Sequence, residues 1–551
     1  YKRQALGQPL AYYVNGRVMV GLDVLLFGYV AIHTVISVLI EKKYPKLNKR
    51  MLGLWAVMML LMIFSKSDYI WPWCYFIMFG CFYKNELENK MPGMTIENIA
   101  AACEGTFVGD RDLVTKEIAG AVTDSRQVQK DYLFIPIKGA RVDGHDFIPQ
   151  VFEKGALVVL SDHALPEETG PYILVSSTTE AMKKIAAFYR TQLSCKVVGI
   201  TGSVGKTSTK EMIASVLEQR YKVLKTEGNF NNEIGLPLTI FKIRAKHEVA
   251  VLEMGISDFG EMHRLAAMAR PDIGVITNIG LCHLENLGTR DGILQAKTEM
   301  FDHLQVDGTV ILNGDDDKLS TKKEVNGKPV IFYGVGADSA FDIKKDIYAT
   351  DIENHGLEGM CAKIHTPQGD FDAKIPIPGE HNVYNALAGT AVGLQLGLSI
   401  REIAQGIASV QTIAGRTNLL HVKGMTVIDD CYNANPVSMK ASIDVLAHTS
   451  GRRIAVLGDM GELGAEEKEL HRSIGKAVAA SGIDALFCAG TLAEEYASEA
   501  KANPECEVHY KKTREEMTEE LLAYVKEGDT VLVKASHFME FPKVVEALTK
   551  E

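Results

Sequence analysis

The stretch KVVGITGSVGKTSTK, residues 196–210, determines the fold of this 551-residue chain. Residues 197–200 form a short β-branched run, which predicts a buried parallel strand. Gly202 and Gly205 interrupt the run, and a helical pattern begins near Ser208. A strand, a glycine-rich turn and a helix N-terminus together form an anion site, because backbone N–H groups and the helix dipole face the same space.

Lys206 and Thr207 give this loop its chemistry, since an ammonium can reach phosphate oxygens and a hydroxyl can ligate Mg²⁺. The standard P-loop pattern G-x-x-x-x-G-K-[ST] requires glycine at position 200, where this chain has Ile200. The remaining T-G-x-x-G-K-T also arises in unrelated turns, but the strand before it and the helix after it favour nucleotide binding. The predicted nucleotide-binding residues are Thr201, Gly202, Ser203, Val204, Gly205, Lys206, Thr207 and Ser208.

Length and composition narrow the possible functions. A chain of 551 residues should contain several domains. Its hydrophobic content of 46% and charged content of 23% are typical of globular protein. The formal net charge of −11 provides no basic surface for nucleic acid. The nine cysteines include no C-x-x-C pair, which favours reduced thiols over disulfides or zinc ligands.

Residues 1–93 differ from the rest of the chain. Residues 18–40 form an apolar run long enough to span a bilayer, and five basic residues follow within 41–50. Two shorter apolar runs occupy 51–64 and 69–83. We predict about three transmembrane helices, with the basic loop and everything after the third helix in the cytoplasm. The alternative is that the two short runs form a buried helical hairpin.

Residues 94–192 predict short strands and helices. The expected strands are 120–124, 132–136, 156–160 and 172–175. Polar, turn-rich stretches follow two of them, and α/β folds place ligand contacts at such positions. Plain loop chemistry is an equally good interpretation of the spacing alone. The candidate residues are Asp124, Ser125, Arg126, Lys138, Gly139, Asp143, His145 and Phe147.

Residues 193–412 alternate strands and helices, as in a doubly wound α/β domain. Glu253 ends an apolar strand, 249–253, which suits a second Mg²⁺ ligand of the Walker-B kind. Asn278 ends the predicted strand 273–278, and His283 follows one loop later, where it could complete the metal site or be structural. The spacing around Lys297 predicts a lysine on a solvated helix face.

A second α/β unit is expected in residues 413–551. Its predicted strands are 427–429, 454–457, 485–488 and 530–534. The segment IDDCYNANP, residues 428–436, again places acids and amides at the carboxyl end of a strand, where ligands collect.

Together these motifs resemble the Mur ligase family of cell-wall peptide synthetases over residues 94–551. The family-wide motifs are TGSVGKTSTK (201–210), Glu253, Asn278 with His283, AKTEM (296–300), NGDD (313–316), HNVYNA (381–386) and Gly415-Arg416. The motifs typical of the branch that adds D-alanyl-D-alanine are GNFNNEIGLPLT (228–239), VLEMGISDFGEM (251–262), DDCYNANP (429–436) and VLGDMGELG (456–464).

The resemblance implies three domains: a small UDP-sugar-binding α/β domain (94–192), a central P-loop ATPase domain (193–412) and a C-terminal Rossmann-like domain (413–551). It implies ATP and Mg²⁺ as cofactors, with UDP-N-acetylmuramoyl-tripeptide and D-alanyl-D-alanine as substrates. ATP would convert the tripeptide carboxylate to an acyl phosphate, which the dipeptide amine then attacks. The catalytic part would be monomeric and cytoplasmic. Residues 1–93 lie outside the family pattern, and their apolar runs predict that they tether this part to the bacterial plasma membrane.

The resemblance also assigns roles to single residues. Thr207, Glu253 and His283 would ligate Mg²⁺, and Lys297 would carry a carbamate. ATP would also contact Asn278, Asn313, Arg416 and Asp430. Further substrate-binding candidates are Asn229, Asn231, Asn232, Tyr432, Asn433 and Asn435. The family often has K-G-S-R where this chain has Lys534-Ala535-Ser536-His537, so an acceptor role of that loop stays open.

Two other functions remain as alternatives. One is a sister ligase, either the enzyme that adds the third residue or folylpolyglutamate synthetase, but DDCYNANP argues against both. The other is a membrane-tethered nucleotide-dependent switch, which fits poorly with polar clusters at several strand ends. The sequence leaves open whether the tripeptide ends in diaminopimelate or lysine.

Overall fold

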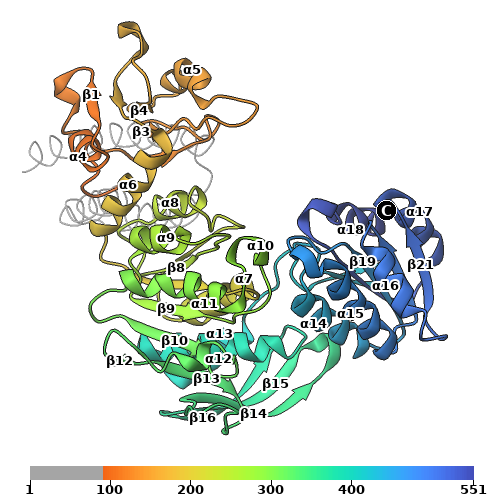
Figure 1. Ribbon diagram of the computed structural model, residues 1–551. Coiled ribbons are helices and arrows are strands. Elements are labelled where there is room, and N and C mark those ends of the chain that lie inside the picture. The colour runs from red at the N-terminus through yellow and green to blue at the C-terminus, as the bar shows by residue number, and fades with distance from the viewer. Residues whose placement is uncertain (1–90, 551) are drawn as a thin grey trace, which may run out of the picture. The chain divides into compact units, whose positions relative to one another are not determined.

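The computed structural model describes residues 91–550 (Figure 1). The predicted transmembrane helices of segment 1–93 therefore lie outside the described residues. Within residues 91–550, no helix is long and apolar enough to cross a membrane. The predicted α/β fold class is confirmed, since strands and helices alternate through three separate main sheets.

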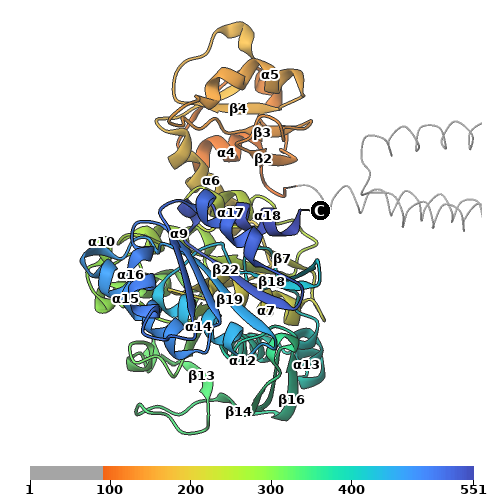
Figure 2. The same ribbon diagram turned by 90° about the vertical axis from the view of Figure 1, so that its right-hand side faces the viewer.

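The first sheet has five strands in the order β1-β5-β4-β3-β2. Strands β2 to β5 are parallel and β1 is antiparallel to β5. All four strands predicted here are present, with ends that shift by up to two residues. Figure 2 shows β2, β3 and β4 with helices α4 and α5 nearby. The elements are α4 (Ile96–Ala102), β1 (Thr106–Val108), β2 (Gly120–Val122), β3 (Tyr132–Phe134), α5 (Ile148–Glu153), β4 (Val158–Ser161), β5 (Tyr172–Leu174) and α6 (Thr178–Thr191).

The second sheet has nine strands in the order β16-β15-β14-β13-β10-β9-β6-β8-β7. Its parallel part runs from β7 to β14 in that sheet, and β15 and β16 extend it with antiparallel pairs. The strands are β6 (Lys196–Thr201), β7 (Val223–Lys225), β8 (Val249–Glu253), β9 (Ile273–Ile276), β10 (Thr309–Asn313), β13 (Ile331–Val335), β14 (Ile347–Asn354), β15 (Met360–Thr366) and β16 (Gly369–Ile375). The antiparallel extension was not predicted from the sequence.

Helices cover both faces of this sheet, as in a doubly wound fold. Neighbouring residues of one strand enter different cores: Val197 packs in one hydrophobic cluster and Val198 in the other. This alternation follows from the pleat, which turns successive side chains to opposite faces. The helices are α7 (Lys206–Leu217), α8 (Gly235–Ile240), α9 (Glu261–Ala269), α10 (Leu284–Leu287), α11 (Arg290–Thr298), α12 (His381–Gln395) and α13 (Ile400–Ala408).

The third main sheet has six strands in the order β17-β18-β22-β19-β20-β21, and only the β17–β18 pair is antiparallel. All four strands predicted in this region are present. The elements are β17 (Asn418–Val422), β18 (Met425–Asp429), α14 (Pro436–Ala447), β19 (Arg452–Gly458), α15 (Glu467–Ala480), β20 (Ala485–Ala489), α16 (Ala493–Ala500), β21 (Glu507–Lys511), α17 (Arg514–Tyr524), β22 (Asp529–Lys534) and α18 (Pro542–Thr549).

Candidate active site

The predicted phosphate loop connects β6 directly to α7. Strand β6 ends at Thr201, and Lys206 is the first residue of the helix. Gly205 caps the helix with a φ of 82°, a left-handed conformation that side chains with a Cβ adopt only with strain. The Lys206 ammonium donates to the Gly202 carbonyl at 2.8 Å, and burial lowers the pKa of Lys206. The loop therefore presents a helix N-terminus and a desolvated ammonium to the same space.

Asn278 fixes the shape of this loop from the end of the neighbouring strand β9. Its side chain accepts from the Val204 N–H at 2.9 Å and donates to the Val204 carbonyl at 3.0 Å. Thr277 donates to the same carbonyl at 2.7 Å. Asn278 thus binds the loop itself, and direct contact of its side chain with ATP stays a prediction.

Glu253, the last residue of β8, lies beside the first turn of α7. Its side chain is buried, and Oε1 accepts from the Thr207 hydroxyl at 3.2 Å and from the Asn231 amide at 2.9 Å. Within residues 91–550, Oε2 has no hydrogen-bond partner, although the Lys210 amine lies 3.8 Å away. A buried carboxylate oxygen without a donor, next to a hydroxyl, is an oxygen donor set that suits Mg²⁺.

Lys297 corrects the prediction from spacing, because it does not lie on a solvated helix face. It is 1% exposed on α11, on the face that also buries Ile293 and Ala296. Among residues 91–550, its amine has no hydrogen-bond or ion-pair partner. Burial, and then the nearby Lys206 ammonium, lower the pKa of Lys297 to about 8.

His283 precedes α10 in a left-handed conformation, with a φ of 52°. Its Nδ1 lies 2.8 Å from a carboxylate oxygen of Glu462. Burial lowers the pKa of His283, and the Glu462 carboxylate opposes that effect. The Lys297 and Lys206 ammonium groups add to the lowering, so His283 lies near both lysines.

Arg416 reaches the phosphate loop from the segment before the third sheet. Its Nη2 donates to the Thr207 hydroxyl at 3.4 Å, and its guanidinium lies 4.2 Å from the centre of the Tyr432 ring. Thr207 therefore contacts both Glu253 and Arg416 through one oxygen.

Asp430 is buried at the end of β18 and accepts from the Ser442 hydroxyl and the Lys534 ammonium, each at 2.6 Å. Burial alone would raise the pKa of Asp430, but the Lys534 ammonium, the Ser442 hydroxyl and the Arg416 guanidinium together lower it. Lys534 also donates to the Asn433 carbonyl at 3.2 Å. The ammonium of the 534–537 loop is therefore held by the 430–433 segment.

Several other predicted site residues shape local turns. Asn313 accepts from the Asp315 N–H at 3.0 Å, Asn232 from the Gly235 N–H at 2.8 Å, and Asn435 caps α14 through Ser438. The Gly139 N–H donates to the Val142 carbonyl at 2.9 Å, and Lys138 forms an isolated bridge with Asp143. Asn229 lies in the loop before α8, and Phe147 ends the 3-10 helix Gly144–Phe147 directly before α5.

The loop after β2 is held by one ion pair and by hydrogen bonds to its backbone. Asp124 accepts from the Arg126 guanidinium at 2.8 Å and from the Arg126 N–H at 2.9 Å, and the pKa of Asp124 is lowered by these bonds. Lys154 donates to the Ser125 carbonyl at 2.8 Å.

Sequence reasoning missed the residues that support the site from behind. The Lys210 amine donates to the Thr226 carbonyl at 2.7 Å, and the Thr226 hydroxyl accepts from the Glu253 N–H at 3.0 Å. Thr209 donates to Asn385 at 2.7 Å and so joins α7 to α12. Thr209, Lys210 and Asn385 lie in the quoted motifs, which was their only signal. Thr226 lies outside those motifs and directly follows β7, a strand that was not predicted.

Three family descriptions match successive parts of the chain. "Mur ligase family, catalytic domain" matches residues 117–190, "Mur ligase middle domain" matches 200–393, and "Mur ligase, glutamate ligase domain" matches 415–537. Each match includes one of the three main sheets in part or whole.

One similar solved structure is MurF from Acinetobacter baumannii, with a TM-score of 0.74 and 31% identity over 82% of this chain and 98% of that chain. Another is MurF ligase from Thermotoga maritima in complex with ADP, with a TM-score of 0.67 and 31% identity over 78% of this chain and 96% of that chain. Curated relatives include the UDP-N-acetylmuramoyl-tripeptide–D-alanyl-D-alanine ligases of Escherichia coli, 34% identical across 79% of this chain and 96% of the relative, and of Bacillus subtilis, 39% identical across 82% and 98%. With this identity over nearly the whole length of such relatives, the chain belongs to the Mur ligase family, in the branch of the tripeptide–D-alanyl-D-alanine ligases.

Proposed function

We infer that this chain is an ATP-dependent amide ligase that joins D-alanyl-D-alanine to UDP-N-acetylmuramoyl-tripeptide. The observation that carries the inference is the phosphate loop with Glu253 and Lys297 buried beside it, in a chain 39% identical to a ligase of that name. The product would be the UDP-muramoyl-pentapeptide precursor of peptidoglycan, with ADP and phosphate.

The first step brings two anions together, the tripeptide carboxylate and the γ-phosphate of ATP. A carboxylate oxygen attacks the γ-phosphorus, the bond to ADP breaks, and an acyl phosphate forms. Lys206 and the N-terminal N–H groups of α7 would stabilise the charge that collects on the phosphate oxygens. Arg416 would approach the same phosphates through its contact with Thr207.

Mg²⁺ fits the oxygen donors present, and would neutralise phosphate charge while held by Thr207 and Glu253. His283 would be its third ligand through Nε2, since Glu462 occupies Nδ1. We propose that Lys297 reacts with CO₂ to give a carbamate, which would place an anionic oxygen next to the Lys206 ammonium.

In the second step the dipeptide amine attacks the acyl carbon. A tetrahedral intermediate forms, phosphate leaves, and the nitrogen loses a proton. We propose that residues 94–192 bind the UDP-sugar and that residues 193–412 bind ATP. Residues 413–551 would complete the site with Arg416 and Asp430. Positioning would supply most of the rate, because the protein forms no covalent bond to substrate.

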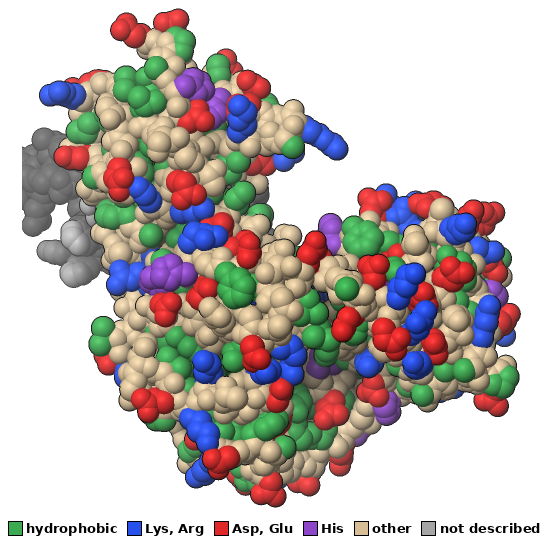
Figure 3. Space-filling model, viewed as in Figure 1, with side chains coloured by type: hydrophobic (Ala, Val, Ile, Leu, Met, Phe, Trp, Pro, Cys, Tyr) green, Lys and Arg blue, Asp and Glu red, His purple; other side chains and the backbone are tan. Residues whose placement is uncertain are grey.

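We propose that residues 1–93 anchor the ligase to the plasma membrane, with the catalytic part in the cytoplasm. The supporting observations are the apolar run 18–40 and the basic segment 41–50 that follows it. On the face shown in Figure 3, acidic and basic side chains are interspersed, so that face has no broad basic strip for a nucleic-acid backbone.

The test is to incubate the purified chain with ATP, Mg²⁺ and UDP-muramoyl-tripeptide, with and without D-alanyl-D-alanine. We expect phosphate release and a pentapeptide product, identified by mass, only when the dipeptide is present. Lys196→Ala, which removes an exposed lysine at the start of β6, the strand that precedes the loop, is the matched control for Lys206→Ala.

The alternatives give different results. An enzyme that adds the third residue would need the UDP-muramoyl-dipeptide and a free amino acid. A folylpolyglutamate synthetase would require a folate and glutamate. A nucleotide-dependent switch would bind ATP and yield no ligated product with any of these substrates, which would overturn the inference.

A further inference from the structure

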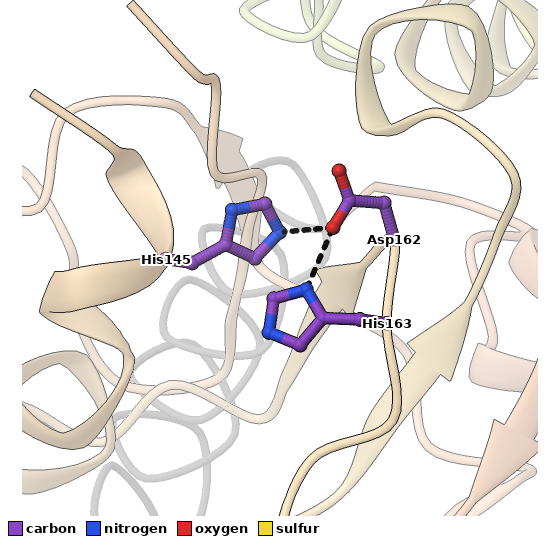
Figure 4. A group of neighbouring side chains, drawn as sticks. All are labelled: His145, Asp162 and His163. Carbon is purple, nitrogen blue, oxygen red and sulfur yellow. Dashed lines mark hydrogen bonds and ion pairs between the residues drawn. The ribbon is translucent and has the colours of Figure 1, made fainter.

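Three side chains of the first sheet converge on one point outside the ATP site (Figure 4). His145 lies on a short 3-10 helix, Gly144–Phe147, after β3, whereas Asp162 and His163 follow β4. Nε2 of His145 is 3.4 Å and Nδ1 of His163 is 2.7 Å from the same oxygen, Oδ1 of Asp162. One possible ligand atom from each residue lies within 4.8 Å of the others.

His145 is the buried member of this cluster, with a side chain only 8% exposed. Its Nδ1 lies 2.7 Å from Oδ1 of Asp143, and a carboxylate can only accept, so Nδ1 is the donor. In the neutral imidazole, Nε2 then carries a lone pair that faces the Asp162 carboxylate. Among residues 91–550, Nε2 has no hydrogen-bond partner. In that neutral form two acceptors face each other, a conflict that a proton on Nε2 or a metal cation between them removes.

The second carboxylate has the position of an outer-shell group in a histidine metal site. A ligating histidine commonly donates its other ring N–H to a carboxylate, which fixes the tautomer and makes the ligand nitrogen more basic. Asp143 holds His145 in this way and also accepts its backbone N–H at 3.0 Å. The His145 ring is therefore oriented before any ligand binds.

The two distances to the Asp162 oxygen can be compared with those of a tetrahedral ion. With bonds of about 2.0 Å, neighbouring ligand atoms in such a site lie about 3.3 Å apart. The 3.4 Å between His145 and Asp162 matches this spacing. The 2.7 Å between Asp162 and His163 must open by about 0.6 Å, which their partly exposed side chains (40% and 57%) permit. The Ser161 hydroxyl steadies the loop, because it donates to the His163 carbonyl at 2.6 Å.

We propose that His145 Nε2, the Asp162 carboxylate and a ring nitrogen of His163 bind a divalent transition-metal ion, with Zn²⁺ as the best fit. Two imidazoles and one carboxylate favour Zn²⁺ over Mg²⁺, which prefers oxygen ligands. Three protein ligands leave one tetrahedral position open to water or to an oxygen of a bound molecule. The ion would join the loop after β3 to the loop after β4. Binding of the ion does not depend on the ligase reaction.

The test is a Zn²⁺ titration of the full-length chain after chelator treatment, against a chromophoric chelator and with Mg²⁺ in excess. We expect one tight site that Mg²⁺ does not occupy. Co²⁺ in place of Zn²⁺ should give the visible absorption of a tetrahedral site. Zn²⁺ should also raise the melting temperature, because it binds the folded chain.

Variants locate the site. His163→Ala and Asp162→Asn change exposed side chains, so folding should be preserved, and each should weaken Zn²⁺ binding by about 100-fold or more. Asp143→Asn removes only the outer-shell acceptor and should weaken binding by about 10- to 100-fold. His355→Ala is the control, since His355 is an exposed histidine paired with Glu353 at 3.3 Å. Equal affinity in wild type and His163→Ala, or no tight binding in wild type, would overturn the proposal.

Discussion

The sharpest prediction concerns the charge of Lys297. An ordinary lysine with a pKa of 10.5 is neutral in about one molecule in a thousand at pH 7.5. With its pKa lowered to about 8, Lys297 is neutral in about a quarter of molecules at the same pH. Only the neutral amine reacts with CO₂, so burial raises the reactive fraction more than a hundredfold. The protonated Lys297 amine is repelled by the Lys206 ammonium, whereas a negatively charged carbamate would be attracted to it.

The same numbers predict a stability effect with a defined sign. The difference between 10.5 and about 8 corresponds to about 3 kcal/mol. Below pH 8 the Lys297 amine is protonated in both the folded and the unfolded chain. The folded state is then destabilised by the full cost of burying the charged amine. Between pH 8 and 10.5 the unfolded chain holds the proton longer, so stability rises with pH. In CO₂-free buffer at pH 7, Lys297→Met should therefore be more stable, by up to about 3 kcal/mol.

Two assays separate the carbamate from the bare amine. In ¹³CO₂-equilibrated buffer, wild type should show a carbamate resonance that Lys297→Ala lacks. Lys297→Ala should be nearly inactive and partly rescued by formate or acetate, which can occupy the vacated space. Lys297→Arg should be inactive without rescue, because it keeps the positive charge and fills the space. Full activity of Lys297→Ala, or the absence of a carbamate signal in wild type, would refute the reasoning.

Three further predictions concern the rest of the chain. Lys206→Ala should lower kcat by about 10²- to 10³-fold, because the Lys206 ammonium faces the phosphates. The control Lys196→Ala should keep the wild-type kcat. More than a tenth of wild-type turnover in Lys206→Ala would contradict the phosphate-loop assignment. Glu253→Gln should raise the Mg²⁺ concentration needed for half-maximal activity, and an unchanged Mg²⁺ dependence would exclude Glu253 as a ligand. Deletion of residues 1–90, which keeps the core residue Met91, should leave a ligase that is active without detergent, and an inactive product would mean that the deleted residues pack on the catalytic part.

Apolar strands were the part of the fold that the sequence predicted best. The strand predicted at 249–253 is β8 residue for residue. Parallel strands buried on both faces consist of uninterrupted apolar residues, so they are visible in a single sequence. Strands β14 to β16 were missed because half-buried or exposed residues interrupt their buried ones, and β14 even ends in exposed residues. That pattern resembles an ordinary loop when only apolar runs are sought.

The expectation that ligands bind at the carboxyl ends of parallel strands located polar residues, but it did not identify the residues that they contact. It found Asn278, yet the Asn278 amide binds the Val204 backbone. It drew attention to His145 but could not bring Asp162 beside it, because that contact depends on the pairing of β3 with β4. Strand order and register are set by tertiary packing, which one sequence without relatives does not reveal.

Lys297 was misplaced by spacing for a different reason. Ile293, Ala296 and Met300 mark the buried face of its helix and the following turn, and Lys297 falls on that face. The buried face seen in the structure therefore includes Lys297, whereas the prediction placed this lysine in solvent, because lysine is almost never fully buried unless paired. Such a conflict between local pattern and residue type is expected where function outweighs stability. Among residues 91–550 the Lys297 amine has no hydrogen-bond partner, and Glu253 Oε2 has only the Lys210 amine, 3.8 Å away. Such burial is costly, and we expect the bound substrates and Mg²⁺ to satisfy both groups.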